Sequence, residues 1–103
     1  PPAEALHGPR TPAEEGVVTV VGIADPDTGK LTEDPDYLAH GFPPDLLDFS
    51  GATPAIQNAL TKAANDNIED LEQIEDLVRR AVSNWAHRTH RRSPLVIPVI
   101  VDA

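Results

Sequence analysis

Two histidines near the C-terminus have the spacing of a metal-binding pair. His87 and His90 lie three residues apart in a segment with helical periodicity, so both imidazoles could face one ion. Zinc needs three or four ligands, and the sequence offers no cysteine and no third histidine nearby. The alternative, which we favour, is two exposed histidines that interact with the C-terminal end of the helix dipole. We therefore expect no metal and no cofactor in this chain.

Carboxylates suggest a second kind of site. Asp25-Pro-Asp27-Thr-Gly29 resembles the start of a calcium loop, but it lacks the third acidic position and the distal glutamate. Proline and glycine at these positions favour a turn instead. The acidic residues that follow have no spacing that pairs two of them across a cleft, which favours a solvated acidic face. These residues are Glu33, Asp34, Asp36, Asp45 and Asp48.

Motifs for catalysis are missing from the sequence. It contains no glycine-rich phosphate loop, no nucleophile elbow and no His-x-Glu metal signature. We therefore expect that this chain is not an enzyme on its own.

Arginines concentrate in one part of an acidic chain. The net charge of −9 argues against non-specific nucleic-acid binding by the whole molecule. Residues 79–101 nevertheless contain no acidic residue and five arginines: Arg79, Arg80, Arg88, Arg91 and Arg92. Bases late in a helix complement its dipole, which explains the cluster without a ligand. The alternative is a patch for RNA or another anionic partner, with Trp85 available to stack on a base.

Apolar runs predict the strands that would position these groups. Gly16–Ala24 is almost continuously apolar, which indicates a central strand, and residues 25–29 form a turn. Lys30–Thr32 would begin the returning strand, and a second extended segment is expected at Tyr37–Phe42. Leu95–Val101 follows a proline stop and shows no polar alternation, which predicts a strand buried on both faces.

Helical periodicity predicts two helices between these strands. Thr53 is a good N-cap before Pro54, which predicts a helix over about 54–66. Asp70 begins a sequence with capping-box spacing, and apolar residues then recur at helical intervals over about 70–90. The order β-β-α-α-β predicts an α+β fold, a small sheet of about three strands packed on one face by two α-helices.

Length and composition indicate a single small domain. The chain has 103 residues, and residues 1–15 contain four prolines and no sustained period, which predicts a linker or extended arm before a domain at 16–103. The absence of cysteine is compatible with a reducing cytoplasm, where we expect the protein. No apolar stretch approaches 18 residues, so we expect no association with membranes. The first residue is not methionine, which suggests a piece of a longer protein.

Several of these segments together resemble the C-terminal domain of ribonuclease J. The strand Val17–Val21 leads into Asp25-Pro-Asp-Thr-Gly-Lys30, and Pro35-Asp-Tyr-Leu-Ala-His-Gly-Phe42 follows. The most specific part is the ending, Thr89-His-Arg-Arg-Ser-Pro-Leu-Val-Ile-Pro-Val-Ile-Val101. His40 stands where the family usually has arginine. The resemblance covers residues 16–103.

The resemblance implies a parent enzyme for RNA decay and RNA processing. Such enzymes join a metallo-β-lactamase domain, an inserted β-CASP domain and a linker to a small C-terminal domain. They use zinc for 5′-to-3′ exonucleolytic and endonucleolytic cleavage of RNA. In that family the C-terminal domain supports assembly and supplies no catalytic residue. The expected partners are a second copy in a homo-oligomer such as a dimer, the parent's own catalytic domain, and RNA through the parent enzyme.

Two hypotheses therefore remain for the function of this chain. The apolar strands carry more hydrophobic surface than two short helices can bury, and a homodimer would bury the rest. We expect that interface on the open sheet face or the final strand, at Val96, Pro98 and Ile100 or their alternates. The competing hypothesis is an RNA-binding accessory module that uses the arginines at the end of the second helix.

Overall fold

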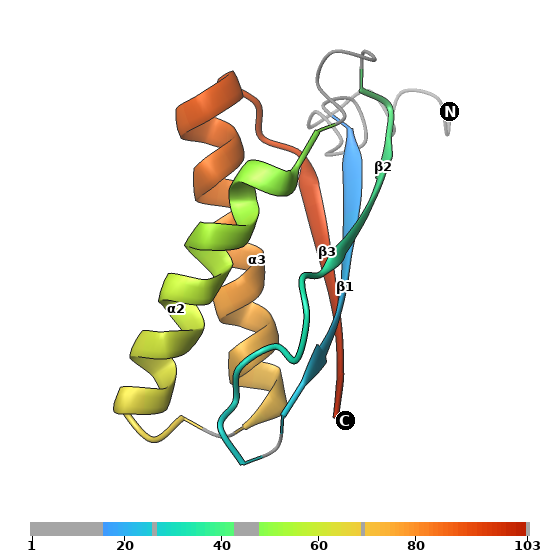
Figure 1. The fold of residues 1–103 in the computed structure, drawn as a ribbon. Coiled ribbons are helices and arrows are strands. Elements are labelled where there is room, and N and C mark those ends of the chain that lie inside the picture. Colours follow the sequence, from blue (N-terminus) through green and yellow to red (C-terminus); the bar gives the residue numbers. More distant parts are fainter. Residues whose placement is uncertain (1–15, 26, 43–47, 69, 103) are drawn as a thin grey trace, which may run out of the picture.

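The fold is a three-stranded mixed sheet with two helices on one face, as predicted (Figure 1). The computed structural model describes residues 16–25, 27–42, 48–68 and 70–102, so the arm predicted at 1–15 lies outside the described residues. The strands are β1 (Val17–Ala24), β2 (Asp36–His40) and β3 (Leu95–Asp102). The helical elements are the short 3₁₀ helix η3 (Ser50–Ala52), α2 (Thr53–Asn65) and α3 (Leu71–His90). The predicted order β-β-α-α-β is confirmed.

Strand β1 occupies the centre of the sheet, between β2 and β3. It pairs antiparallel with β2 and parallel with β3, from Val17 opposite Leu95 to Ala24 opposite Asp102. The two helices lie in the connection from β2 to β3, and such a long connection lets β3 run parallel to β1. The central position of β1 agrees with its nearly continuous apolar sequence.

The predicted turn after β1 is confirmed. The Asp25 side chain accepts a hydrogen bond from the Asp27 amide at 2.8 Å, and the Asp25 carbonyl accepts one from the Gly29 amide at 2.7 Å. Gly29 has a φ of 73°, which favours glycine. Beyond the turn, Leu31 forms an isolated bridge to Ala24 before the chain reaches β2.

The two helix starts differ in how far the sequence predicted them. Asp70 is the N-cap of α3, and its carboxylate accepts a hydrogen bond from the Glu72 amide at 3.2 Å. Thr53, in contrast, is not a cap: it is the first residue of α2, after Ala52, which makes no side-chain capping bond. The Thr53 hydroxyl instead lies 2.9 Å from the Tyr37 hydroxyl. The predicted cap was wrong because the preceding turn is helical and the hydroxyl bonds to β2.

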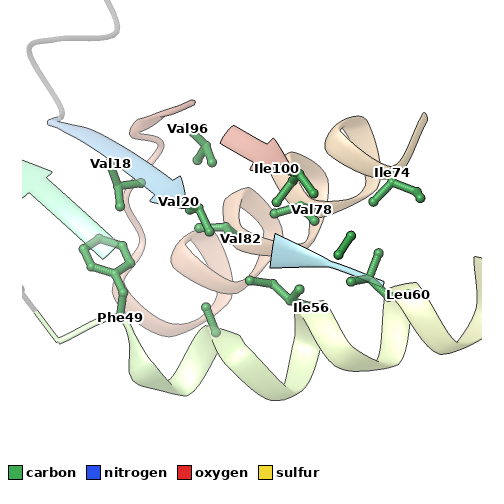
Figure 2. Packing of buried hydrophobic residues seen from close by; sticks show 12 residues of the cluster. Val18, Val20, Phe49, Ile56, Leu60, Ile74, Val78, Val82, Val96 and Ile100 are labelled. Atoms are coloured by element: carbon green, nitrogen blue, oxygen red, sulfur yellow. The ribbon is translucent and has the colours of Figure 1, made fainter. Parts of the chain in front are cut away.

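The hydrophobic core lies between the sheet and the helices (Figure 2). The helices contribute residues at intervals of three or four, which line one face of each. The sheet contributes alternate residues of β1 and β3. The core residues that Figure 2 labels are Val18, Val20, Phe49, Ile56, Leu60, Ile74, Val78, Val82, Val96 and Ile100.

Strand β3 is not buried on both faces, which corrects the prediction for Leu95–Val101. Val96 and Ile100 are buried beneath the helices, but the alternate residues are 38 to 48 % exposed. The physical reason is the position of β3 at the border of the sheet, with helices on one face only. An apolar run without alternation does not distinguish a strand covered on both faces from one whose second apolar face is open.

Candidate interaction surface

The second face of the sheet is an apolar surface that the described helices do not cover. We call it the open face. Its side chains come from alternate positions of all three strands, because successive strand residues point to opposite faces. The exposed members are Leu38 (54 % exposed), Leu95 (41 %), Ile97 (40 %), Val99 (38 %) and Val101 (48 %), and the partly buried members from β1 are Val17, Thr19, Val21 and Ile23.

The strand register places these side chains beside one another. Thr19 of β1 lies opposite Ile97 of β3 on one side and Leu38 of β2 on the other. The same parallel register sets Val21 beside Val99. The apolar members therefore form one continuous patch over β3 and β1 that reaches Leu38 of β2, and Asp36 and His40 lie on either side of Leu38 on the same face. Single exposed apolar residues are ordinary, whereas a continuous patch marks a surface that binds something.

The size of the open face suits a modest protein interface. From the exposed fractions, its side chains present on the order of 500 Å² of apolar surface, near the upper end for a monomer. If two such faces met, they would bury about 1,000 Å², which is close to the lower limit for a specific complex.

The three predicted interface residues, Val96, Pro98 and Ile100, belong to the side of β3 that faces the helices and not to the open face. Val96 is 4 % and Ile100 is 3 % exposed, and both belong to the hydrophobic core. Pro98 shares their alternation and is partly buried. None of the three can therefore line an interface on the open face. Their alternates Leu95, Ile97, Val99 and Val101 line that face instead, while the existence of an interface stays a prediction.

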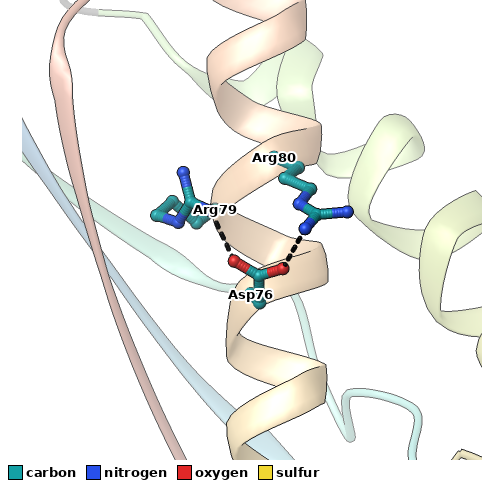
Figure 3. Close-up of polar contacts among 3 residues, drawn as sticks. All are labelled: Asp76, Arg79 and Arg80. Carbon is teal, nitrogen blue, oxygen red and sulfur yellow. Dashed lines mark hydrogen bonds and ion pairs between the residues drawn. The ribbon is translucent and has the colours of Figure 1, made fainter.

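The predicted basic cluster divides into two groups. In the first group, Arg79 and Arg80 both form ion pairs with Asp76, the Arg80 pair at 2.9 Å (Figure 3). The hydrogen bond from Arg79 lowers the pKa of Asp76, and the charge of Arg80 lowers it further. These two arginines are partly neutralised within their own helix, which weakens the case for their role in anion binding.

The second group lies at the C-terminal end of α3. Arg88 is in the last turn, Arg91 is the C-cap with a φ of 55°, and Arg92 follows. In the described part of the chain, none of the three forms an ion pair with an acidic residue. Favourable interaction with the helix dipole accounts for this group without a ligand, because the last carbonyls of a helix carry partial negative charge.

Trp85 is poorly placed to stack on a base. The centroid of its ring lies 5.6 Å from that of Phe49 and 5.2 Å from that of His90, and the His90 ring meets it edge to face. On another side it packs against Gly51, where an added Cβ would lie only 3.0 Å from the indole. Trp85 therefore closes the end of the hydrophobic core next to η3.

The two histidines do not form a metal site with other described residues. No group of three or more histidine, cysteine, aspartate or glutamate side chains in the described segments could hold a metal ion. His90 packs on Trp85, while His87 is exposed. Near this corner, hydrogen bonds from the Ser50 hydroxyl and amide lower the pKa of Asp48, and the charge of His90 adds to them. His40 lies exposed at the end of β2, opposite Val17.

No helix in the described residues is long and apolar enough to cross a membrane.

Comparisons with known proteins identify relatives of this chain. A family model described as "Ribonuclease J C-terminal domain" matches residues 10–103. The chain is 26 % identical over 99 residues to a ribonuclease J of Mycolicibacterium smegmatis, an alignment that covers 96 % of this chain and 18 % of that protein. It is 27 % identical over 95 residues to a ribonuclease J of Mycobacterium tuberculosis, covering 92 % of this chain and 17 % of the relative. A ribonuclease J of Corynebacterium glutamicum is 23 % identical over 100 residues, covering 96 % and 14 %. The chain thus spans less than a fifth of the length of each of these relatives.

Proposed function

The chain belongs to the ribonuclease J C-terminal domain family, and from this premise we propose that it is an assembly domain that joins copies of its parent enzyme through the open face. The observation that carries the proposal is the continuous apolar patch of β1 and β3, which extends to Leu38 of β2. Burial of apolar surface is the main favourable term in protein association, so a patch of this kind favours a partner.

The proposed partner is a second copy of this chain. Most soluble oligomers are symmetric, and in a two-fold dimer the same patch serves both copies. The open face is apolar on β1 and β3 and at Leu38, whereas Asp36 and His40 flank Leu38 on the outer strand β2. A second open face therefore matches it best where the contact centres on β1 and β3. With about 1,000 Å² buried, the contact is near the minimum for a specific complex. We therefore expect a weak dimer of the isolated chain, with further contacts from other parts of the parent.

The proposal also covers what the parent enzyme does. Relatives bear the name ribonuclease J, which supports RNA degradation and processing as the activity of the full-length protein. We propose 5′-to-3′ exonucleolytic and endonucleolytic cleavage in the cytoplasm, with zinc held by metallo-β-lactamase and β-CASP segments outside this chain. RNA would then reach the domain only through the parent. The described residues offer no group of metal ligands to this chemistry.

Sedimentation equilibrium of the 103-residue chain over a wide concentration range tests the proposal. We expect a dimer of about twice 11.1 kDa at the upper concentrations. Its dissociation constant should change little between two salt concentrations, because apolar contacts are not screened. A monomer at all concentrations would exclude a second copy as the sufficient partner of the open face. The catalytic domain of the parent would then be the occupant to test.

A second candidate function is RNA binding at the end of α3. The observation in its favour is that Arg88, Arg91 and Arg92 all lie at the C-terminal end of α3 and form no ion pair in the described part of the chain. Binding of single-stranded RNA by these residues would weaken steeply as salt increases, since phosphate contacts release counterions. An Arg88→Ala, Arg91→Ala variant should then bind more weakly, with Arg79→Ala as the control. If the chain does not bind single-stranded RNA even at low salt, this function is excluded.

A further inference from the structure

The outer edge of β3 has the features of a second, competing association surface. Strand β3 lies at the border of the sheet and is eight residues long. An edge strand of this length can pair with a strand of another molecule through its unpaired amides and carbonyls. Whether copies meet at the open face or at this edge depends on which backbone groups the edge presents.

The backbone orientation along β3 follows from one hydrogen bond and the register. The Leu95 amide donates to the Gly16 carbonyl beside β1 at 3.0 Å. Pairing with β1 then continues without a bulge to Asp102. In a strand, the amide and carbonyl of one residue point to the same side, and the next residue points to the other. The odd-numbered residues therefore bond toward β1, and the even-numbered residues point outward from the sheet.

The two middle outward positions cannot donate to a new strand. Pro98 has no amide hydrogen, and proline in a sheet is tolerated where it faces the outside of an edge. The Ile100 amide donates to the carboxylate Oε2 of Glu75, on α3, at 3.2 Å in a partly buried position. This contact joins residues that are 25 apart in the sequence, and it confirms that the Ile100 amide points away from β1.

We propose that Pro98 and Glu75 close the outer edge of β3 to strand addition, so that a second copy docks on the open face and does not extend the sheet. The choice of a second copy rests on the proposed function. Two sheets packed through their faces align within about 30° of each other. A closed edge also prevents the apolar face from being repeated along a growing fibre, because strand addition at the edge does not terminate by itself.

The test uses the 103-residue chain with its open face disabled by Ile97→Asp. In this background, Glu75→Ala together with Pro98→Val restores two outward amides. We expect a new associated species in sedimentation velocity, at concentrations where Ile97→Asp alone is monomeric. Glu75→Gln is the matched control, since its amide oxygen still accepts from the Ile100 amide and the edge stays closed. Circular dichroism establishes that each variant is folded.

Hydrogen exchange of the Ile100 amide provides a second readout that does not depend on association. Glu75→Ala should accelerate this exchange about tenfold, as expected for one lost hydrogen bond, whereas Glu75→Gln should leave it nearly unchanged. An Ile100 amide that exchanges at the same rate in the unsubstituted chain and in Glu75→Ala would overturn the role of Glu75.

The outcomes separate this proposal from the proposed function. If the edge variant stays monomeric in the Ile97→Asp background, the closed edge is wrong and the open face is unaffected. If the Ile97→Asp chain has the same mass in solution as the unsubstituted 103-residue chain while the edge variant associates, the closed edge is supported and the open-face dimer is wrong.

Discussion

Replacement of Ile97 by aspartate is the sharpest perturbation of the open face. Ile97 lies in the middle of β3, opposite Thr19, and is 40 % exposed. It does not belong to the hydrophobic core, so the substitution leaves the packing between sheet and helices intact. A charge at this position would be buried without a partner in a dimer formed through the open face.

The magnitude follows from the exposed area of the side chain. An isoleucine that is 40 % exposed presents about 80 Å², and its burial contributes about 2 kcal/mol at ~25 cal/mol per Å². Both copies of a symmetric dimer carry the substitution, so the loss is about 4 kcal/mol before the cost of desolvating two carboxylates is added. The dissociation constant should therefore increase about a thousandfold or more.

Sedimentation equilibrium measures this change directly. We expect the Ile97→Asp chain to be monomeric at concentrations at which the unsubstituted chain is dimeric. Asn58→Asp is the control, because Asn58 is exposed on α2, away from the open face, and the change adds the same charge with almost the same shape. If the Ile97→Asp chain dimerises with the same dissociation constant as the unsubstituted chain, the role of the open face is refuted. Equal loss in both variants would assign the effect to net charge.

Three further predictions concern the folded domain itself. Leu60→Ala should lower the free energy of unfolding by about 2–5 kcal/mol in urea denaturation, because Leu60 is 1 % exposed; a loss below 1 kcal/mol would contradict its place in the core. Burial raises the pKa of Tyr37 above 10.0 despite the Thr53 hydrogen bond, so the unfolded chain loses the phenol proton first. Stability should therefore fall as pH rises above 10.0, and Tyr37→Phe should remove that contribution in unfolding measured against pH. Asp70→Ala should destabilise the domain by about 1 kcal/mol through loss of the α3 cap, with exposed Glu72→Ala as the comparison in thermal unfolding.

The sequence predicted most of the fold because its patterns are locally strong. The apolar positions of α3 recur every three or four residues, and Asp70 supplies the cap that begins the helix. The central position of β1 follows from a nearly continuous apolar run. Local patterns did not predict the role of Thr53, because its hydroxyl was equally suited to a helix cap or to a hydrogen bond with Tyr37, a residue 16 positions away.

The sequence could not assign which residues of β3 face the helices and which lie on the open face. Odd and even positions of β3 are both apolar, so no alternation shows which set faces the helices. One local signal was available: Pro98 in the strand interior indicates an edge strand. The ion pairs of Arg79 and Arg80 with Asp76 were also within reach, because they lie at helical spacings of three and four.

The sequence by itself determined the element order, the fold class and the family, because local periodicity, turn residues and the closing segment carry that information. Only the tertiary structure decided that β3 borders the sheet and that its odd residues form the open face. It alone placed the Glu75 carboxylate on the Ile100 amide. The reason is that burial and edge protection depend on which distant segments become neighbours, and two apolar alternations in one strand are equivalent until helices cover one of them.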